Sequence, residues 1–207
     1  KVNDAIAVLP VVQKSAVASC VPVEGSSGNN VYLPGDEREL FNIADQYNYS
    51  EGAAEVFGIK FLEGREAVTA NEVAVSRKFV EKMQEFADWS DGAIGKGIIL
   101  TEHSQTKEDI FTICGVYEDY KIGGVYVDDR PSVRFAAVRG EKYLYLSGVA
   151  IKVHELTPAA IASVQKVVDE LFPDRGIEVI AYSDGMKEAF SDVKKINDAI
   201  LLGGLFS

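Results

Sequence analysis

The chain has 207 residues, of which 47% are apolar, 26% charged and 10% aromatic. These proportions are typical of a folded globular protein and exclude a disordered or low-complexity chain. Lysine and arginine number 21 against 32 aspartates and glutamates, which gives a formal net charge of -11. Because a negative protein repels phosphate groups, nucleic acid and anionic lipid headgroups are not expected as partners.

A short helix is predicted at the start of the sequence. It spans Lys1 to Leu9, with Asp4 as its cap. Pro10 ends it, because proline lacks the backbone N–H that the helix would need.

Strands follow this helix. β-branched residues at 17–23 and from Val31 onward, separated by the glycine- and serine-rich turn 25–30, predict a hairpin. From Glu37 to Tyr49 the apolar residues have no regular period, and we expect a strand with irregular flanks.

The middle of the chain is mainly extended, with two helical segments. Ala53 to Phe57 is predicted as a helical turn ending at Gly58, and a longer helix is capped by Ser76. Strands at 98–100 and 110–117 predict a hairpin with a polar tip at 102–109. The other predicted strands are 59–62, 73–75, 133–138 and 149–153.

The C-terminal part predicts helix, strand and helix. Thr157 and Pro158 begin a helix with an apolar stripe that ends at Pro173. A strand is expected at 177–182, and Ser183 or Asp184 caps the final helix. The apolar residues 199–207 suit either a helix approaching a membrane or one docked on the core.

This order of elements predicts an α+β fold with two lobes. Residues 1–64 and 146–207 would form an α/β lobe that ends in β-α-β-α, close to a membrane, and residues 65–145 an inserted β-rich lobe. No stretch has the roughly 18 to 20 apolar residues that cross a bilayer. The truncated look of both ends nevertheless suggests flanking transmembrane helices outside this sequence.

No constellation of catalytic, cofactor-binding or metal-binding residues emerges. The glycine-rich segment 92–97 lacks the Ser or Thr that a phosphate loop needs after its lysine, so a tight turn at Gly95 and Gly97 is expected. His103 and His154 have no partner at metal-ligand spacing and are expected at the surface. No serine has the setting of a hydrolase nucleophile, including Ser26, Ser27 and Ser147.

Adjacent charges are expected to be surface features. Glu118 with Asp119 and Asp128 with Asp129 could carry acid–base chemistry, but neighbouring side chains in a strand point apart. The basic pairs Arg77–Lys78 and Lys194–Lys195 are expected on solvated helix faces.

The two cysteines, Cys20 and Cys114, do not determine the compartment. They have no zinc or redox spacing, and Cys114 lies in an apolar run that predicts a small buried side chain. A disulfide between them remains an open alternative.

Several segments, taken in order, resemble the extracytoplasmic core domain of MacB/FtsX-type ABC transporter permeases. VFGIKFLEGR at 56–65 resembles that family's evfgikllaGR segment, and FTICGVYEDY at 111–120 resembles its ytVvGVvkDf strand. VAVS at 73–76 and AIGK at 93–96 are similar to its strand-then-helix segment and its piGk turn. The likeness runs from about residue 53 to 207, including the closing helices, and is loose before residue 53.

The resemblance implies a domain without catalysis or cofactors, on the outer side of a bacterial inner membrane. It would couple cytoplasmic ATP hydrolysis to export, lipoprotein release or partner regulation. The implied partners are an ABC ATPase, a second permease protomer and an extracytoplasmic protein.

The alternative is a free-standing ligand-binding or sensor domain. Its binding cleft would be lined by aromatic residues, although a place in the core or between the lobes is the simpler expectation for them. The residues concerned are Tyr47, Tyr49, Tyr117, Tyr120 and Tyr126.

Overall fold

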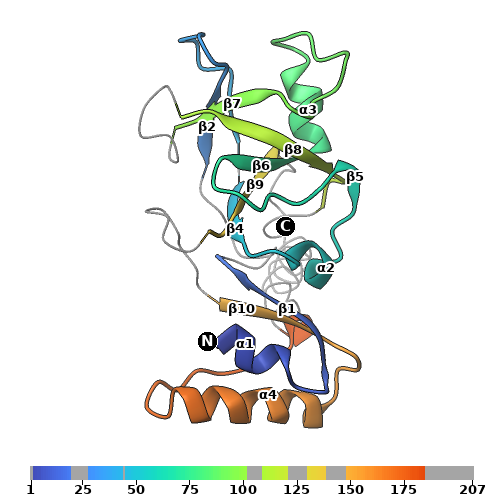
Figure 1. The fold of residues 1–207 in the computed structure, drawn as a ribbon, viewed down its shortest axis with the longest axis vertical. Coiled ribbons are helices and arrows are strands. Elements are labelled where there is room, and N and C mark those ends of the chain that lie inside the picture. The colour runs from blue at the N-terminus through green and yellow to red at the C-terminus, as the bar shows by residue number, and fades with distance from the viewer. Residues whose placement is uncertain are drawn as a thin grey trace, which may run out of the picture.

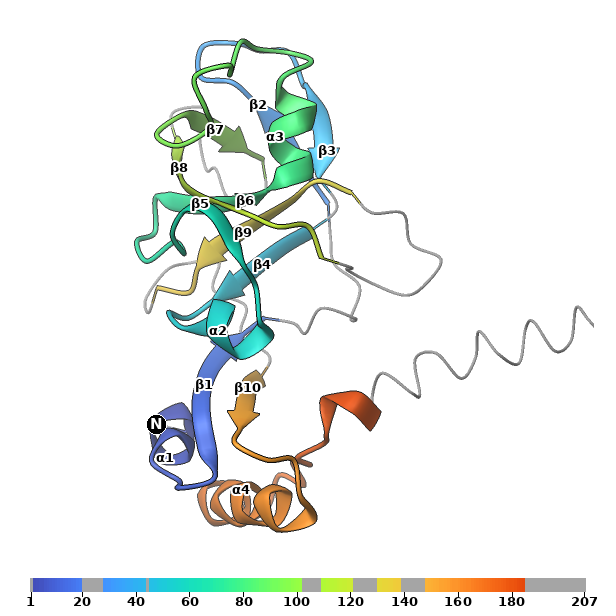
Figure 2. The same ribbon diagram turned by 90° about the vertical axis from the view of Figure 1, so that its right-hand side faces the viewer.

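A computed structural model of the chain describes residues 2–19, 28–43, 45–101, 109–120, 130–138 and 148–184. Helices α1 (Val2–Ala7) and α4 (Pro158–Leu171) lie at one end of its long axis, and α3 (Arg77–Met83) lies near the other (Figure 1). Helix α2 (Ala53–Phe57) lies between these ends (Figure 2).

The described strands form one ten-stranded sheet in the order β10-β1-β4-β9-β6-β8-β7-β2-β3, with β5 paired to β8. The pairs β4–β9 and β6–β8 are parallel, and the other pairs are antiparallel. The predicted mixed α+β fold class is confirmed. The strands are β1 (Val12–Ala18), β2 (Asn29–Tyr32), β3 (Phe41–Ile43), β4 (Asp45–Tyr49), β5 (Phe61–Gly64), β6 (Glu72–Ser76), β7 (Gly97–Leu100), β8 (Phe111–Tyr117), β9 (Ser132–Ala136) and β10 (Gly148–Val153).

The predicted helix boundaries are confirmed where local chemistry sets them. Ser76 Oγ accepts a hydrogen bond from the backbone N–H of Phe79 at 3.2 Å, and Thr157 Oγ1 accepts one from Ala160 at 3.1 Å. These side chains satisfy N–H groups that the first helical turn leaves unpaired. Gly58 ends α2 in the left-handed conformation, with φ of 68°.

The predicted hairpin between 17–23 and the strand at Val31 is wrong. β1 pairs with β10 and β4, whereas β2 pairs with β3 and β7. A local turn therefore does not decide the pairing of β1, because its main partner lies more than a hundred residues further along the chain. Residues 20–27, which include the first half of the predicted turn, lie outside the described residues.

The predicted strand at 177–182 is also wrong. The backbone N–H of Val179 donates to Gln165 Oε1 at 2.8 Å, and Gln165 Nε2 donates to the carbonyl oxygen of Ile177 at 2.8 Å. This segment therefore runs beside α4, bonded to a helix side chain instead of a neighbouring strand. A helix begins at Tyr182, and its predicted continuation and the apolar tail lie outside the described residues.

Three hydrophobic clusters follow each other along the molecule. The largest packs α3 against the sheet, around Phe79 and Met83. The second packs α2 against β1 and β4, through Ala16, Ala18, Tyr49 and Ala53, and the third packs α1 and α4 against β1.

We call α1, β1, β10 and α4 the terminal unit, and β2 to β9 with α3 the central unit. The second hydrophobic cluster joins these two units. β2, which belongs to the predicted 1–64 segment, pairs with β7 of the predicted insert. The lobe boundaries at residues 64 and 146 stay a prediction.

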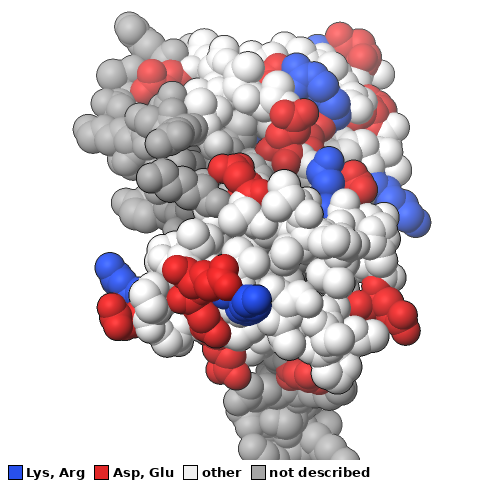
Figure 3. All heavy atoms as spheres, turned by 60° about the horizontal axis from the view of Figure 1, so that its bottom comes forward, with Lys and Arg blue, Asp and Glu red and all other residues white. Residues whose placement is uncertain are grey.

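The surface at the terminal end carries scattered charge. On the face shown in Figure 3 the basic side chains lie beside acidic ones and form no continuous patch. Among the described residues, none of the helices has the length and apolar character needed to cross a bilayer.

A glycine in β8 tests the packing of the sheet. A Cβ atom at Gly115 would press on the carbonyl oxygen of Arg65 and lie 2.7 Å from Phe61 Cε1, whereas one at Gly148 would meet nothing within 4 Å. We expect Gly115→Ala to lower the free energy of unfolding by about 3 kcal/mol, and Gly148→Ala to change it by less than about 0.5 kcal/mol. Urea unfolding of the two variants measures this difference, and equal effects would contradict the described close contact.

Candidate functional site

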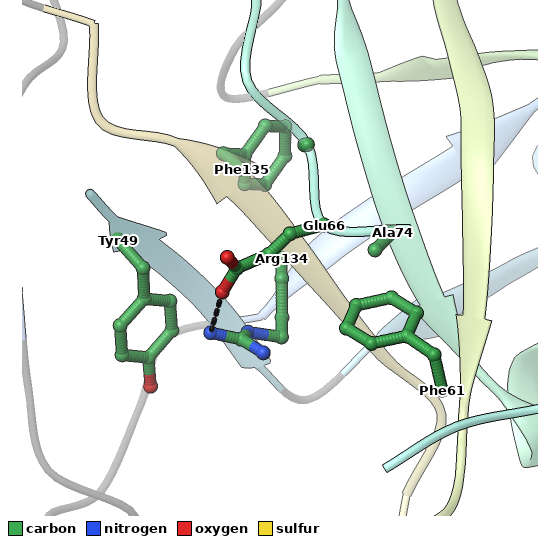
Figure 4. Close-up of a pocket in the computed structure, with 7 residues that line it drawn as sticks. Tyr49, Phe61, Glu66, Ala74, Arg134 and Phe135 are labelled. Atoms are coloured by element: carbon green, nitrogen blue, oxygen red, sulfur yellow. Dashed lines mark ion pairs between the residues drawn. The ribbon is translucent and has the colours of Figure 1, made fainter. Parts of the chain in front are cut away.

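The candidate site lies where α2, the central sheet and the loop after β5 meet. A small cavity of about 10 Å³, room for about one water molecule, lies at this place. Figure 4 shows Arg134 reaching from β9 toward Glu66, with aromatic side chains on either side. The lining residues are Tyr49, Phe61, Glu66, Ala67, Ala74, Arg134 and Phe135.

Arg134 is the unusual residue of this site. It is only 3% exposed, because β9 is covered on both faces. Its guanidinium carbon lies 4.3 Å from the ring centre of Tyr49 and 5.9 Å from that of Tyr117, so aromatic faces stabilise the cation. The nearest charge is the Glu66 carboxylate, with 3.8 Å between Arg134 Nη2 and Glu66 Oε1.

The Arg134–Glu66 ion pair contains no hydrogen bond. At 3.8 Å the nitrogen and oxygen are too far apart for one. Nε, Nη1 and Nη2 of Arg134 are all buried, and none has a hydrogen-bond partner among the described residues. Buried N–H groups without acceptors destabilise a fold, and a charged group does so more strongly. The site thus holds a cation whose charge is balanced but whose N–H groups are unsatisfied.

Glu66 instead holds the start of α2. Its Oε2 accepts a hydrogen bond from the backbone N–H of Gly52 at 2.8 Å, and its Oε1 accepts one from Ala54 at 2.5 Å. Gly52 occupies the N-cap position with φ of 86° and has no side chain to cap the helix. Glu66 therefore acts as a remote cap that ties α2 to the loop after β5.

The other side of α2 contacts the terminal unit. Lys14 Nζ in β1 lies 3.6 Å from Glu55 Oε2, and Lys152 Nζ in β10 donates to the carbonyl oxygen of Glu55 at 3.4 Å. The rings of Phe57 in α2 and Tyr49 in β4 pack edge to face with centroids 5.4 Å apart. Helix α2 therefore contacts both units.

The direct link between the units within the sheet is short. Ala18 and Tyr49 form the one registered pair described between β1 and β4. The backbone N–H of Ser50 donates to the carbonyl oxygen of Val17 at 2.9 Å, and that of Ser19 donates to Asn48 at 2.9 Å. Two hydrogen bonds to side chains add to this link, from the backbone N–H of Val17 to Ser50 Oγ at 2.9 Å and from that of Asn48 to Ser19 Oγ at 3.0 Å.

The loop that carries Glu66 is fixed to the central unit by Arg65 and Glu72. Both guanidinium Nη atoms of Arg65 donate to the Glu72 carboxylate, which also accepts from the backbone N–H groups of Val68 and Thr69. Hydrogen bonding from Arg65, more than any other contact, lowers the pKa of Glu72 to about 2. The loop that carries Glu66 is therefore held on the central unit.

The glycine-rich segment forms a turn, as predicted. Gly95 is left-handed, with φ of 83°, and its N–H donates to Ile113. Lys96 Nζ lies 2.7 Å from Asp91 Oδ1, so the lysine belongs to a local ion pair. His154 is exposed, as expected, and His103 lies outside the described residues.

The structure places the predicted basic pair Arg77–Lys78 beside Asp119 of the predicted acidic pair. Asp119 accepts hydrogen bonds from Arg77 Nε at 3.0 Å and from the backbone N–H of Lys78 at 2.9 Å, at the start of α3. Glu118 Oε2 is 3.8 Å from Lys60. Asp119 therefore positions a helix and does not pair with Glu118. The pairs Asp128–Asp129 and Lys194–Lys195 lie outside the described residues, as do Ser26, Ser27 and Ser147.

Cys114 is a half-buried free thiol, less buried than predicted. Its Sγ donates to the carbonyl oxygen of Val73 at 3.3 Å, and burial raises the pKa of the thiol. Cys20 lies outside the described residues. In the part of the chain that the structure describes, no group of three or more His, Cys, Asp or Glu residues is placed to hold a metal ion.

The aromatic residues lie mainly in the core and at the junction of the units. Tyr49 and Tyr117 are 3% and 0% exposed, and Tyr120 packs beside Tyr117 with ring centres 5.7 Å apart. The core position expected for Tyr49 and Tyr117 is thus confirmed. The side chain of Tyr47 and all of Tyr126 lie outside the described residues.

Sequence reasoning missed Arg134 and Glu66. The available signal was the charge of Arg134 inside the otherwise apolar predicted strand 133–138. Because Lys and Arg are rarely buried without a partner, such a position indicates a special environment. Glu66 has no comparable signal, since one more acidic residue in a polar turn is ordinary.

Compared with solved structures, the chain has the fold of extracytoplasmic domains from ABC transporter permeases. The periplasmic region of MacB from Actinobacillus actinomycetemcomitans superposes with a TM-score of 0.59 and 16% identity, over 92% of this chain and 81% of that one. The extracellular domain of the noncanonic ABC-type transporter YknZ from Gram-positive bacteria gives 0.57 and 12%, over 87% of each chain. The family resemblance found in the sequence is confirmed at the level of the fold.

A third structure has the same fold. It is a domain of a protein described as a permease from Porphyromonas gingivalis, with a TM-score of 0.56 and 15% identity, over 82% of this chain and 74% of that one. No protein-family model and no curated protein matches the sequence. The likeness therefore concerns the fold, because the sequences themselves have diverged widely.

The lowered pKa of Glu72 predicts an acid-dependent loss of stability. A carboxyl group whose pKa falls on folding, here from 4.5 to about 2, stabilises the fold above pH 4.5 and loses this effect as the pH falls toward 2. We expect Glu72→Gln to reduce the difference in unfolding free energy between pH 5 and pH 2.5. Denaturant titrations across this range measure it, and parallel profiles for the variant and the original chain would contradict the assignment.

Proposed function

We propose that this chain is an extracytoplasmic domain of an ABC transporter permease and that it performs no chemistry. The observation that carries the proposal is the fold likeness to the MacB periplasmic region, which spans 92% of this chain. The ordered sequence resemblances at 56–65 and 111–120 support it independently. The domain would lie on the outer side of a bacterial inner membrane, anchored by flanking transmembrane helices.

Its role would be to transmit movement from the membrane to the outer side. Cytoplasmic ATP hydrolysis would act through the membrane helices on the terminal unit, where β1 and β10 lie side by side. Helix α2 would pass this movement to the central unit, since it contacts both units through Glu55 and Glu66. The output would be export, lipoprotein release or regulation of a partner protein.

The partners of such a domain follow from this role. An ABC ATPase would drive it, and a second permease protomer would complete the transporter. An extracytoplasmic protein would receive the movement at the end of the central unit that lies farthest from α4, near α3 (Figure 1).

A ligand-binding or sensor domain is the weaker candidate. The cavity beside Arg134 has about 10 Å³, whereas sites for small molecules typically have about 300 to 1,000 Å³. The second hollow follows a single stretch, 84–90, and is open to solvent. The buried Tyr49 and Tyr117 support packing of the units more than a binding cleft.

Labelling of the membrane-embedded protein tests the proposed location. We expect Ser90→Cys, in a Cys20→Ser and Cys114→Ser background, to react with a membrane-impermeant maleimide in intact spheroplasts, because Ser90 is exposed in the loop after α3. The same background without the new cysteine is the control. Labelling only after the membrane is permeabilised would place the domain inside the cell and overturn the proposal.

A further inference from the structure

Two sets of donors compete for the carboxylate of Glu66. The backbone N–H groups of Gly52 and Ala54 hold it now, at 2.8 and 2.5 Å. The guanidinium of Arg134 lies 3.8 Å from the same Oε1 that accepts from Ala54, and its three buried nitrogens have no hydrogen-bond partner among the described residues. One carboxylate thus faces two groups and bonds to one.

We propose that Glu66 is a two-position switch that exchanges the start of α2 for Arg134. In the described position it caps α2. In the other position α2 is released. The Glu66 carboxylate then moves about 1 Å closer to the Arg134 guanidinium and forms charge-assisted hydrogen bonds of roughly 2.8 Å with it.

The exchange replaces one set of hydrogen bonds to the Glu66 carboxylate by another. Releasing α2 breaks two hydrogen bonds from backbone N–H groups, which water can then reach. Closing on Arg134 satisfies buried N–H groups that are unsatisfied in the described position. An exchange of this kind produces an element with two states, whose populations a force can shift.

The surroundings of Arg134 favour this exchange over the binding of a ligand. Arg134 and Glu66 together are neutral, and the other lining residues carry no charge, so a bound anion would leave the buried site with a net negative charge. The limited cavity suits water more than a larger neutral molecule. The switch is a property of the chain itself, and only its use in transport rests on the proposed function.

The position of Glu66 connects the switch to the two units. The Arg65–Glu72 pair holds the base of Glu66 on the central unit, and Arg134 lies in β9 of the same unit. Helix α2 is linked to the terminal unit through Lys14 and Lys152. Movement of the terminal unit would therefore pull α2 away from Glu66, and the carboxylate could then bond to Arg134.

Amide hydrogen exchange of the 207-residue chain tests the switch. In Arg134→Met the second position has no donor for the Glu66 carboxylate, so α2 stays capped. We expect the amide protons of Gly52 and Ala54 to exchange about tenfold more slowly, or slower still, than in the original chain. Arg38→Met, which removes an exposed guanidinium that pairs with Asp36, is the matched control and should not slow this exchange. Unchanged or faster exchange in Arg134→Met would overturn the proposal.

Thermal unfolding gives a second, independent readout. Glu66→Gln leaves the buried cation uncompensated and should lower the melting temperature by about 10 °C. Arg134→Met leaves Glu66 bonded to α2 and should change it by no more than about 3 °C. Combining Glu66→Gln with Arg134→Met should recover most of the lost melting temperature. A large destabilisation by Arg134→Met alone would show an ordinary structural ion pair and overturn the switch, without affecting the proposed location of the domain.

Discussion

The arrangement of the molecule depends on how Glu66 satisfies the start of α2. This helix has five residues and a glycine at its N-cap, so no N-cap side chain accepts from its first N–H groups. A carboxylate from the loop after β5 supplies the acceptor, and that loop is fixed by the Arg65–Glu72 pair. One side chain therefore caps the start of this helix, in addition to the contacts that Glu55 and Phe57 make, and the cap is sensitive to whatever else Glu66 can bond.

This constraint gives the domain a mechanical organisation. The terminal and central units each have a hydrophobic cluster, and a smaller cluster around Tyr49 and Ala53 joins them. Packed clusters move as rigid bodies, whereas a junction that contains unsatisfied polar groups is the place where movement costs least. Transmission of force, as proposed for this domain, would need this combination.

The features that the sequence predicts well are those set within a few residues. Ser76, Thr157 and Gly58 mark helix ends because each contacts a backbone group of its own helix end. The β7–β8 hairpin is similar, since its strands are close in the sequence. Pairing of β1 with β10 could not be found in this way, because no short-range pattern reports a partner so far along the chain.

The site was largely hidden for the same reason. Arg134, Glu66 and α2 come from separate segments, and their meeting depends on the parallel pairing of β9 with β4. A lone arginine in an apolar strand indicates that something must balance it, but not which carboxylate does so. The strand expected at 177–182 does not form for a different reason. The side chain of Gln165 occupies the backbone groups that a neighbouring strand would have paired.

The most direct test of coupled movement is a distance between the two units in the complete membrane-embedded transporter. Spin labels at Ala162→Cys in α4 and Gln84→Cys after α3, both exposed positions, would report it in a background without other cysteines. Two separated units joined through α2 predict that the distance distribution shifts when the ATPase binds ATP. The same distribution with and without ATP would contradict a role in transmitting movement.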